Sequence, residues 1–297
     1  MTTPTELSEG ETASLTPEAP PALPAFNPAR LEAELLRDRV LRLALGLLVG
    51  VAVSAVLVWL PGAYGIDPGL SLMLAALLVL GVWVSRAVTN AKAAGAARGL
   101  LAAAELSPPN AEVRLQPWLD RRALVDWVRL MLYQAWATLR HRQGRHAEAA
   151  AICASVLRRP LGPGEGARPQ LLLLLAESSL EANDPWGAYF ALTQLHGTPV
   201  TLNQLLQRVG LQVRYEVTLG NDHAALAHWP RKAELAELMP GPLCGVTHAM
   251  LGLAAYRTEQ HDAAAWLTHR AELLCEPAQL KQLREQHLAV PAVDVSA

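Results

Sequence analysis

Charge is missing from two long stretches of this sequence. Residues 43–60 read LALGLLVGVAVSAVLVWL and residues 68–85 read PGLSLMLAALLVLGVWVS, without one Asp, Glu, Lys or Arg. At a rise of about 1.5 Å per residue, a helix of this length is about as long as the hydrocarbon core of a bilayer is thick. We therefore expect two transmembrane helices, over about 43–60 and 68–86, and the alternative is a pair of buried helices in a soluble core. The absence of ionisable residues argues against an ion or proton path through the pair.

Aromatic residues and cysteines are also scarce. Aromatics make up 5% of the 297 residues and Phe occurs twice, so the remaining chain must pack with Leu, Ala and Val. That composition favours helices over strands. The three cysteines, Cys153, Cys244 and Cys275, fit neither a disulfide framework nor a CxxC pattern, and we expect free thiols in packed helices of a reducing compartment. A net charge of −2 gives no general attraction to nucleic acid.

Motifs of known chemistry are missing as well. The Gly-rich segment 161–166, LGPGEG, follows a helix and a proline, whereas a phosphate-binding loop follows a strand. The sequence has no HExxH and no GxSxG element, and His141 and His146 are five residues apart and do not share a helix face. We therefore predict no catalytic residue, no cofactor site, no metal site and no enzyme activity.

Basic residues predict how the two apolar helices are oriented. The connecting turn, 61–67, has no Lys or Arg, and its single charge is Asp67. The basic residues that flank the pair are Arg30, Arg37, Arg39 and Arg42 before the first helix, and Arg86, Lys92 and Arg98 after the second. Because positive charge stays on the cytoplasmic side during insertion, we expect a multi-pass protein of the cell inner (plasma) membrane with both termini in the cytoplasm.

The rest of the chain divides into segments of different composition. Residues 1–29 are rich in Pro, Thr and Glu and predict a disordered tail. Residues 30–42 predict an amphipathic lead-in to the first membrane helix, and the second helix continues to about residue 106. A Ser-Pro-Pro-Asn sequence then predicts a linker over 107–113. A helical domain is expected over 114–285, followed by a flexible tail over 286–297.

Small residues form one face of the first apolar helix. Gly46, Gly50 and Ser54 recur every four residues, a spacing that lets another helix approach closely. The expected partner is the second helix of the same hairpin, through Ala75, Ala76 or Gly81. Homodimerisation is the alternative use of this face.

From residue 114 onward the sequence repeats weakly. Four segments each predict a helix, a tight turn and a second helix, beginning with 126–142, Gly144 and 146–157. Pairs of small residues stand 12 positions apart in these segments: Ala137 with Ala149, Ala176 with Ala188, and Gly252 with Ala264, while Val213 with Ala225 has a larger first member. Successive units are offset by 39, 37 and 39 residues. Small residues on both helices let the two backbones pack closely.

These units resemble tetratricopeptide (TPR) repeats, which place small residues on both helices, a turn residue between them and a proline at the end. The matching residues are Ala137, Gly144, Ala149 and Pro160 in the first unit, and Ala176, Asn183, Ala188 and Pro199 in the second. The period near 38 is longer than the 34 of the family, and Pro230 falls within the expected second helix of the third unit. The resemblance implies an all-α fold: a transmembrane helical hairpin followed by a TPR-like α-solenoid of about three to four helical hairpins.

In the TPR family the first helices line a concave groove that binds peptides or partner helices. Carried over to this sequence, the resemblance implies that the groove-facing residues are Gln134, Thr138, His141, Glu177, Arg214 and Tyr256. The alternative is that these side chains merely face solvent.

Charge is unevenly distributed outside the apolar helices. Residues 86–159 carry twelve basic and five acidic residues, and residues 161–297 carry nine and fourteen. The basic part, next to the second membrane helix, favours contact with anionic lipid, or plain solvation. Alternatively, Arg140, Arg142 and Arg145 receive an acidic partner.

Together these features predict a membrane-anchored scaffold or adaptor that presents a protein-binding groove at the cytoplasmic membrane surface. In layout the chain resembles bacterial proteins with two amino-terminal membrane helices followed by TPR units, some of them associated with haem synthesis. The alternative is a structural or assembly subunit of a larger integral-membrane complex, or a homo-oligomer, that packs through its transmembrane hairpin. The expected partners are the lipid bilayer and a protein or peptide in the groove.

Overall fold

The computed structural model describes residues 25–65, 67–106 and 108–288, and within these residues the regular structure is helical, without a strand. The helices are α1 (Pro28–Tyr64), α2 (Pro68–Leu106), α3 (Pro108–Leu119), α4 (Asp126–Arg142), α5 (His146–Leu157), the 3₁₀ helix η1 (Gly162–Ala167), α6 (Arg168–Glu181), α7 (Pro185–His196), α8 (Leu202–Thr218), α9 (Asp222–Leu226), α10 (Trp229–Ala236), α11 (Gly241–Arg257), α12 (His261–Leu274) and α13 (Pro277–Leu288). Most of the two tails expected over 1–29 and 286–297 lies outside the described residues.

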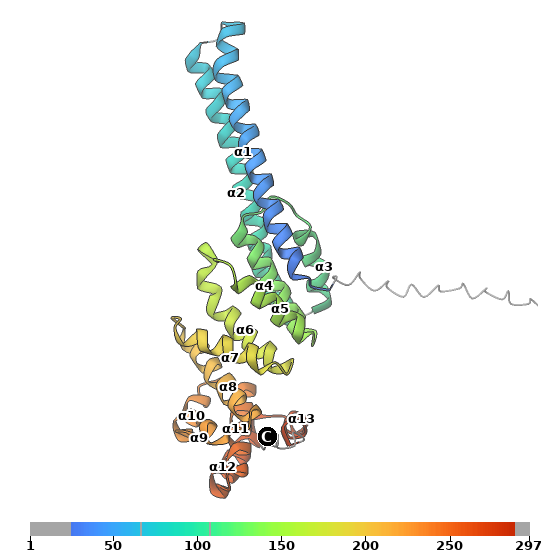
Figure 1. Cartoon of the computed structure of the whole chain (residues 1–297), viewed down its shortest axis with the longest axis vertical. Helices are drawn as coiled ribbons and strands as arrows, with labels where there is room; N and C mark the ends of the chain where they lie inside the picture. The colour runs from blue at the N-terminus through green and yellow to red at the C-terminus, as the bar shows by residue number, and fades with distance from the viewer. Residues whose placement is uncertain (1–24, 66, 107, 289–297) are drawn as a thin grey trace, which may run out of the picture.

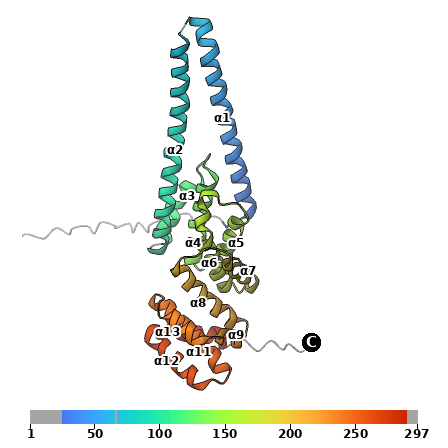
Figure 2. The ribbon, with the colours of Figure 1, turned by 90° about the vertical axis from the view of Figure 1, so that its left-hand side faces the viewer.

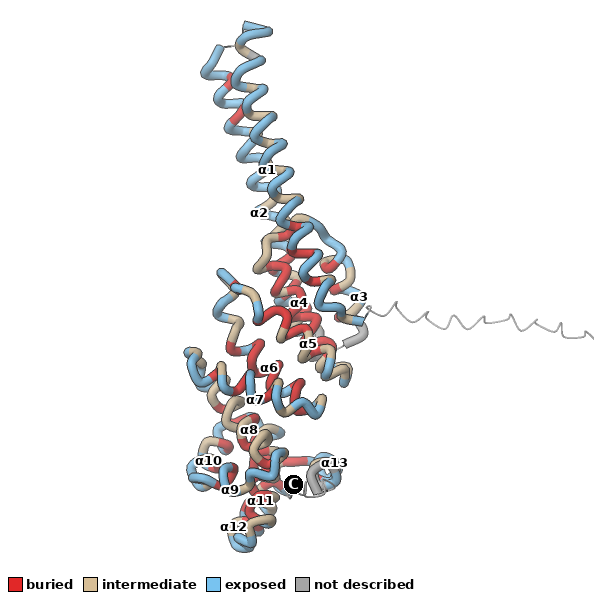
Figure 3. The backbone as a smooth tube through the Cα atoms, viewed as in Figure 1, coloured by how far each residue is buried: buried red, intermediate tan, exposed pale blue. Residues whose placement is uncertain are grey.

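The two longest helices form a hairpin that extends from one end of the elongated molecule (Figure 1). Figure 2 shows α1 and α2 meeting at their connecting turn and diverging toward the other helices. Each contains an 18-residue window apolar enough to cross a membrane, with mean hydropathy of 2.6 and 2.0, and only 0% and 11% of these windows is buried. Figure 3 shows this outward exposure along the hairpin. The alternative of two helices buried in a soluble core is therefore not what the structure shows.

The first helix begins earlier than the sequence suggested. Asn27 caps α1, because its side-chain oxygen accepts the N–H of Ala29, and Pro28 occupies the first turn, where a missing N–H costs nothing. Just before it, Phe26 packs edge-on against Tyr133 and Trp136, with ring centroids 6.2 and 5.7 Å apart. The expectation of a disordered tail as far as residue 29 is therefore wrong for its last residues, which the aromatic contacts and the helix cap hold in place.

The base of the hairpin shares one hydrophobic core with the helices that follow. Leu31 and Leu35 of α1 and Leu100 of α2 are buried in the same cluster as Leu132 of α4. The expected linker over 107–113 is also wrong for its described residues, since α3 starts at Pro108 and its Ala111 is buried in this core. Proline is favoured in the first turn of a helix, so the two prolines begin α3 and do not form a flexible connection.

A buried guanidinium joins the base of α1 to α4. Arg129 is 0% exposed, and its Nε and Nη2 lie 3.0 and 2.6 Å from Asp38 Oδ2. Its Nη1 donates to the carbonyl oxygen of Leu119 at 2.7 Å and lies 3.4 Å from Glu34 Oε2. The hydroxyl of Tyr133 donates to the same Glu34 oxygen at 2.9 Å. Every hydrogen-bonding edge of the guanidinium is therefore used inside the protein.

Both long helices also hold the segment that leads into α4. Asp38 Oδ1 of α1 accepts the backbone N–H of Ala123, and Asn90 Oδ1 of α2 accepts that of Val125, each at 3.0 Å. Asp126, the first residue of α4, pairs with Arg39, whose Nη2 lies 2.7 Å from its Oδ2, and with Arg42. Two of the basic residues that predicted the orientation of the hairpin are therefore ion-paired to the helical domain.

Beyond this junction, four helix–turn–helix connections share one turn geometry. Gly144, Asn183, Gly220 and Glu259 all have positive φ, between 56° and 74°, at spacings of 39, 37 and 39 residues. In each turn the next residue donates its N–H to the carbonyl five residues earlier, as Arg145 does to Arg140 and Gln260 does to Ala255, both at 2.9 Å. This is the Schellman arrangement that ends a helix with a left-handed residue.

The small residues 12 positions apart lie where the paired helices touch. Ala137, Ala149, Ala176 and Ala188 are each 0% exposed. A Cβ added to Gly252 would lie 3.0 Å from the hydroxyl of Thr268 on α12, so a larger residue here would require the side chain of Thr268 to shift.

The third unit differs from the others. Its second part is split into α9 and α10 at His228, which has a φ of 56°, and Pro230 stands in the first turn of α10. A proline removes the N–H that a continuous helix would need there.

Loss of the buried guanidinium should destabilise the chain strongly. Arg129→Met leaves the Asp38 carboxylate buried without its partner, and we expect a loss of about 3–5 kcal/mol in the free energy of unfolding. Urea unfolding in detergent, followed by tryptophan fluorescence, measures this loss. Arg158→Met removes an exposed arginine and should change stability by less than about 1 kcal/mol. Equal effects of the two substitutions would contradict the role of Arg129.

Candidate functional site

A groove of about 650 Å³ runs across α4, α6, α8, α11 and α13. Five of the six residues that the sequence assigned to a groove line it: Gln134, Thr138, His141, Glu177 and Arg214. These five residues come from α4, α6 and α8, and the packing of these helices brings their side chains to one groove. The sixth residue, Tyr256, lies on a second cavity of about 610 Å³ between α11, α12 and α13.

One end of the groove holds a cluster of ionisable side chains. His141 Nε2 lies 3.7 Å from Glu177 Oε1, and its Nδ1 lies 3.0 Å from the hydroxyl of Ser178. Across the turn, His146 places its Nδ1 3.4 Å from that of His141, and the ring centroids are 5.0 Å apart. The cluster therefore joins α4, α5 and α6.

Because the two histidines do not share a helix face, the sequence predicted no common site for them. The Schellman turn at Gly144 instead folds the start of α5 back on the end of α4, so residues five apart meet across the connection. The predicted turn at Gly144 was the signal that could have found this contact.

Opposite charges lower the pKa values of both groove glutamates. Burial alone would raise the pKa of Glu177, but the hydrogen bond and charge of His141, with the nearby arginines, lower it below its ordinary value. For Glu181 burial is likewise outweighed by Arg214, whose Nη1 lies 2.7 Å from its Oε1, and the pKa is lowered. Both carboxylates are therefore held in the charged, hydrogen-bond-accepting form, which suits binding rather than proton transfer at neutral pH.

Uncharged amides line the rest of the groove. Four glutamines reach it from four different helices: Gln134 on α4, Gln170 on α6, Gln207 on α8 and Gln279 on α13. A carboxamide offers two donors and an acceptor, which match the N–H and C=O groups of a peptide backbone. Glu181 pairs with Arg214, and Glu177 lies beside His141 with Arg142 also on the groove, so carboxylates and guanidiniums balance and the surface has no strong preference for a ligand of either charge.

The basic cluster expected to receive an acidic partner is largely neutralised within the chain. Arg140 is 1% exposed, with Nη1 3.3 Å from Glu112 and Nε 3.0 Å from Glu148, and Arg145 also pairs with Glu148. The cluster does not form one cationic surface, because α3 and α5 bring acidic residues against it. The third member, Arg142, lines the groove.

The small-residue face of α1 does not pack on α2. Gly46, Gly50 and Ser54 are exposed, and a Cβ added to either glycine would meet no atom within 4 Å. The expectation that this face binds the second helix of the hairpin is therefore wrong within the chain. The two helices instead diverge, and near the turn they bury Ser71 and Ala75 of α2. Contact of the face with another chain stays a prediction.

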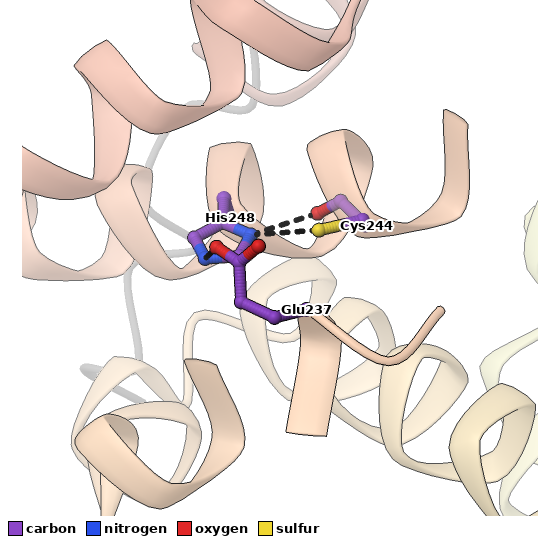
Figure 4. A group of neighbouring side chains, drawn as sticks. All are labelled: Glu237, Cys244 and His248. Carbon is purple, nitrogen blue, oxygen red and sulfur yellow. Dashed lines mark hydrogen bonds and ion pairs between the residues drawn. The ribbon is translucent and has the colours of Figure 1, made fainter. Parts of the chain in front are cut away.

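A third group of side chains lies between α10 and α11 (Figure 4). Cys244 and His248 stand one turn apart on α11, and Glu237 follows the end of α10. One possible ligand atom from each lies within 4.8 Å of the others. The three cysteines of the chain are buried free thiols, as predicted. Burial, followed by the charge of Glu237, raises the pKa of the Cys244 thiol.

In comparisons with protein-family models, curated proteins and solved structures, no match to this chain was found. The TPR resemblance therefore stays a prediction from the sequence, and the functional argument depends on the geometry described above.

Acidification should destabilise the folded chain through His146. Burial, followed by the neighbouring His141, lowers the pKa of His146 below 6.5 in the folded chain. As the pH falls, His146 is therefore protonated in the unfolded chain before it is protonated in the folded chain, which favours unfolding. Melting temperature should therefore fall as the pH drops below about 6.5, and His146→Gln should remove part of this fall. His223→Gln, at an exposed histidine on α9, is the control and should leave the pH profile unchanged. An unchanged profile in both variants would show that His146 does not contribute.

Proposed function

We propose that this chain is a membrane-anchored, TPR-like scaffold or adaptor whose groove binds an extended segment of a partner protein. The observation that carries the proposal is the groove itself, where five side chains named from the sequence line one cavity. A groove of this kind binds by shape and hydrogen bonds, since its two carboxylates and two guanidiniums balance in charge.

The glutamines support an extended peptide as the ligand. Successive backbone groups of an extended chain are spaced at about 3.3 Å per residue and alternate in direction, so amides from several helices can each bind a different peptide group. A folded partner presents few such free backbone groups. Binding through backbone atoms would allow partners of varied sequence.

The hairpin supports a place at the membrane. Its outward apolar side chains form a surface that a soluble protein seldom exposes, and both helices are long and apolar enough to span a bilayer. With the basic residues on the cytoplasmic side, both termini and the groove face the cytoplasm of the inner (plasma) membrane. Confinement to a surface raises the effective concentration of membrane-bound partners, so modest affinity in the groove is enough.

Thiol labelling tests this orientation. Ala63→Cys, near the turn of the hairpin, should react with a membrane-impermeant thiol reagent added outside the cell, whereas Asn203→Cys, on α8, should not. Both positions are exposed, and the native cysteines are buried, so the unmodified chain provides a low background. Labelling at Asn203→Cys in sealed cells would contradict the proposed orientation.

Removing two groove amides should weaken partner binding. With about 0.5–1.5 kcal/mol lost per hydrogen bond, the double variant Gln170→Ala/Gln279→Ala should retain partners at least about fivefold less well. Quantitative proximity labelling in native membranes, with the full-length chain, measures this loss. Gln260→Ala, an exposed amide outside the groove, is the matched control. Point variants are preferable to deletion of the repeats, because deletion would expose the core that α1 shares with α4.

The exposed small-residue face favours a second candidate, assembly into a larger membrane complex or a homo-oligomer. In the same experiment Gly46→Leu/Gly50→Leu would obstruct close approach of another helix. Partners lost with this variant and retained with Gln170→Ala/Gln279→Ala would establish the assembly role and overturn the scaffold proposal. Partners lost only with the groove variant would establish the scaffold.

A further inference from the structure

His248 stands in an environment that calls for a cation. It is 0% exposed, and its Nδ1 lies 3.0 Å from the carbonyl oxygen of Cys244. A carbonyl oxygen only accepts hydrogen bonds, so Nδ1 carries a proton. Nε2 faces Oε1 of Glu237 at 3.4 Å, yet it has no hydrogen-bond partner among the described residues. The second ring nitrogen of a fully buried imidazole therefore lies next to a carboxylate oxygen without a hydrogen bond to it.

The geometry fits a metal ion better than a shared proton. Nε2 and Oε1 are 3.4 Å apart, yet no hydrogen bond joins them. Two ligands of one tetrahedral zinc ion, each about 2.1 Å from it, are about 3.4 Å apart, and each points at the ion and not at the other ligand. The separation of Nε2 and Oε1 equals this distance.

We propose that Glu237, Cys244 and His248 bind a thiophilic divalent cation, with Zn²⁺ as the ion that fits the ligand set. This site is separate from the groove and does not depend on the proposed function. Sulfur and imidazole nitrogen select zinc over Mg²⁺ or Ca²⁺, which prefer all-oxygen sites. Cys244 contributes its sulfur after losing its proton, which passes to solvent as the metal binds.

The surroundings support such a site. Cys244 contacts Nδ1 of the imidazole twice, through its carbonyl oxygen at 3.0 Å and its Sγ at 3.6 Å, so the ring is held in place and Nε2 is left for the metal. Arg270 holds the Glu237 carboxylate through two bonds of 2.7 Å, and Oε1 keeps a second lone pair for the ion. The Glu237 side chain is 36% exposed, which provides an entry path, while Trp266 packs near the imidazole with its ring centroid 5.9 Å away.

Three ligands leave one coordination position open on a tetrahedral ion. Because the Glu237 side chain is 36% exposed, a water molecule could reach the ion and fill this position. The bound ion would also tie the end of α10 to α11, next to the point where the third unit is broken. Metal binding should therefore stabilise the folded state.

Cobalt substitution tests the proposal on the full-length, metal-free protein in detergent. Co²⁺ should bind with one equivalent, give a thiolate-to-cobalt charge-transfer band in the near ultraviolet and intense visible bands of a tetrahedral ion, and be displaced by Zn²⁺. Cys244→Ser should abolish the charge-transfer band. Cys153→Ser and Cys275→Ser, at the other two buried thiols, should retain it.

Glu237→Gln keeps the proposal testable even where a core substitution fails to fold, since this side chain is partly exposed. It should lower the affinity for Co²⁺ by about tenfold or more without loss of helical circular dichroism. Absence of the thiolate band in the unmodified protein would show that Glu237 and His248 form an ion pair only, and would overturn the proposal. Loss of the band in Cys153→Ser or Cys275→Ser, with retention in Cys244→Ser, would do the same.

Discussion

The structure depends on one buried charge, the guanidinium of Arg129. A charge that is removed from water must be paired and hydrogen-bonded, and here the partners are two acidic residues of α1 and two backbone carbonyls before α4. Asp38 in turn binds the backbone of Ala123, so the same carboxylate fixes both the arginine and the loop beside it. The long first helix and the helical domain are therefore one folded body, because neither can satisfy these groups without the other.

Local signals in the sequence predicted much of the fold. The two apolar runs, the bounds of α4 and α5 and the turns at Gly144 and Asn183 depend on periodicity, charge and residues suited to positive φ, all of which are read within a few residues. The junction could not be predicted in the same way. Its two partners, Asp38 and Arg129, are 91 residues apart, and each reads as an ordinary surface charge until the helices are placed together.

The candidate sites show the same difference between what local sequence predicts and what depends on distant residues. The candidate groove residues were implied by the resemblance to TPR repeats, and five of the six line one cavity. His141 and His146 do not share a helix face, and only the turn at Gly144 between their helices brings the two rings together. The cluster around His248 needs Glu237 from the preceding helix, and the irregular course from α9 to α11 hid that neighbour.

The unbroken course of α1 from Pro28 to Tyr64 has a mechanical consequence. Its 37 residues make a rod about 55 Å long, with one end in the apolar hairpin and the other inside the core of the helical domain. A domain on a flexible linker samples many heights and orientations above a membrane. A domain on a rigid helix is held at one height and in one orientation. In a bilayer, the tilt of this helix would set the direction in which the groove faces. Membrane thickness and neighbouring helices, which determine the tilt, would therefore change the orientation of the groove without contacting it.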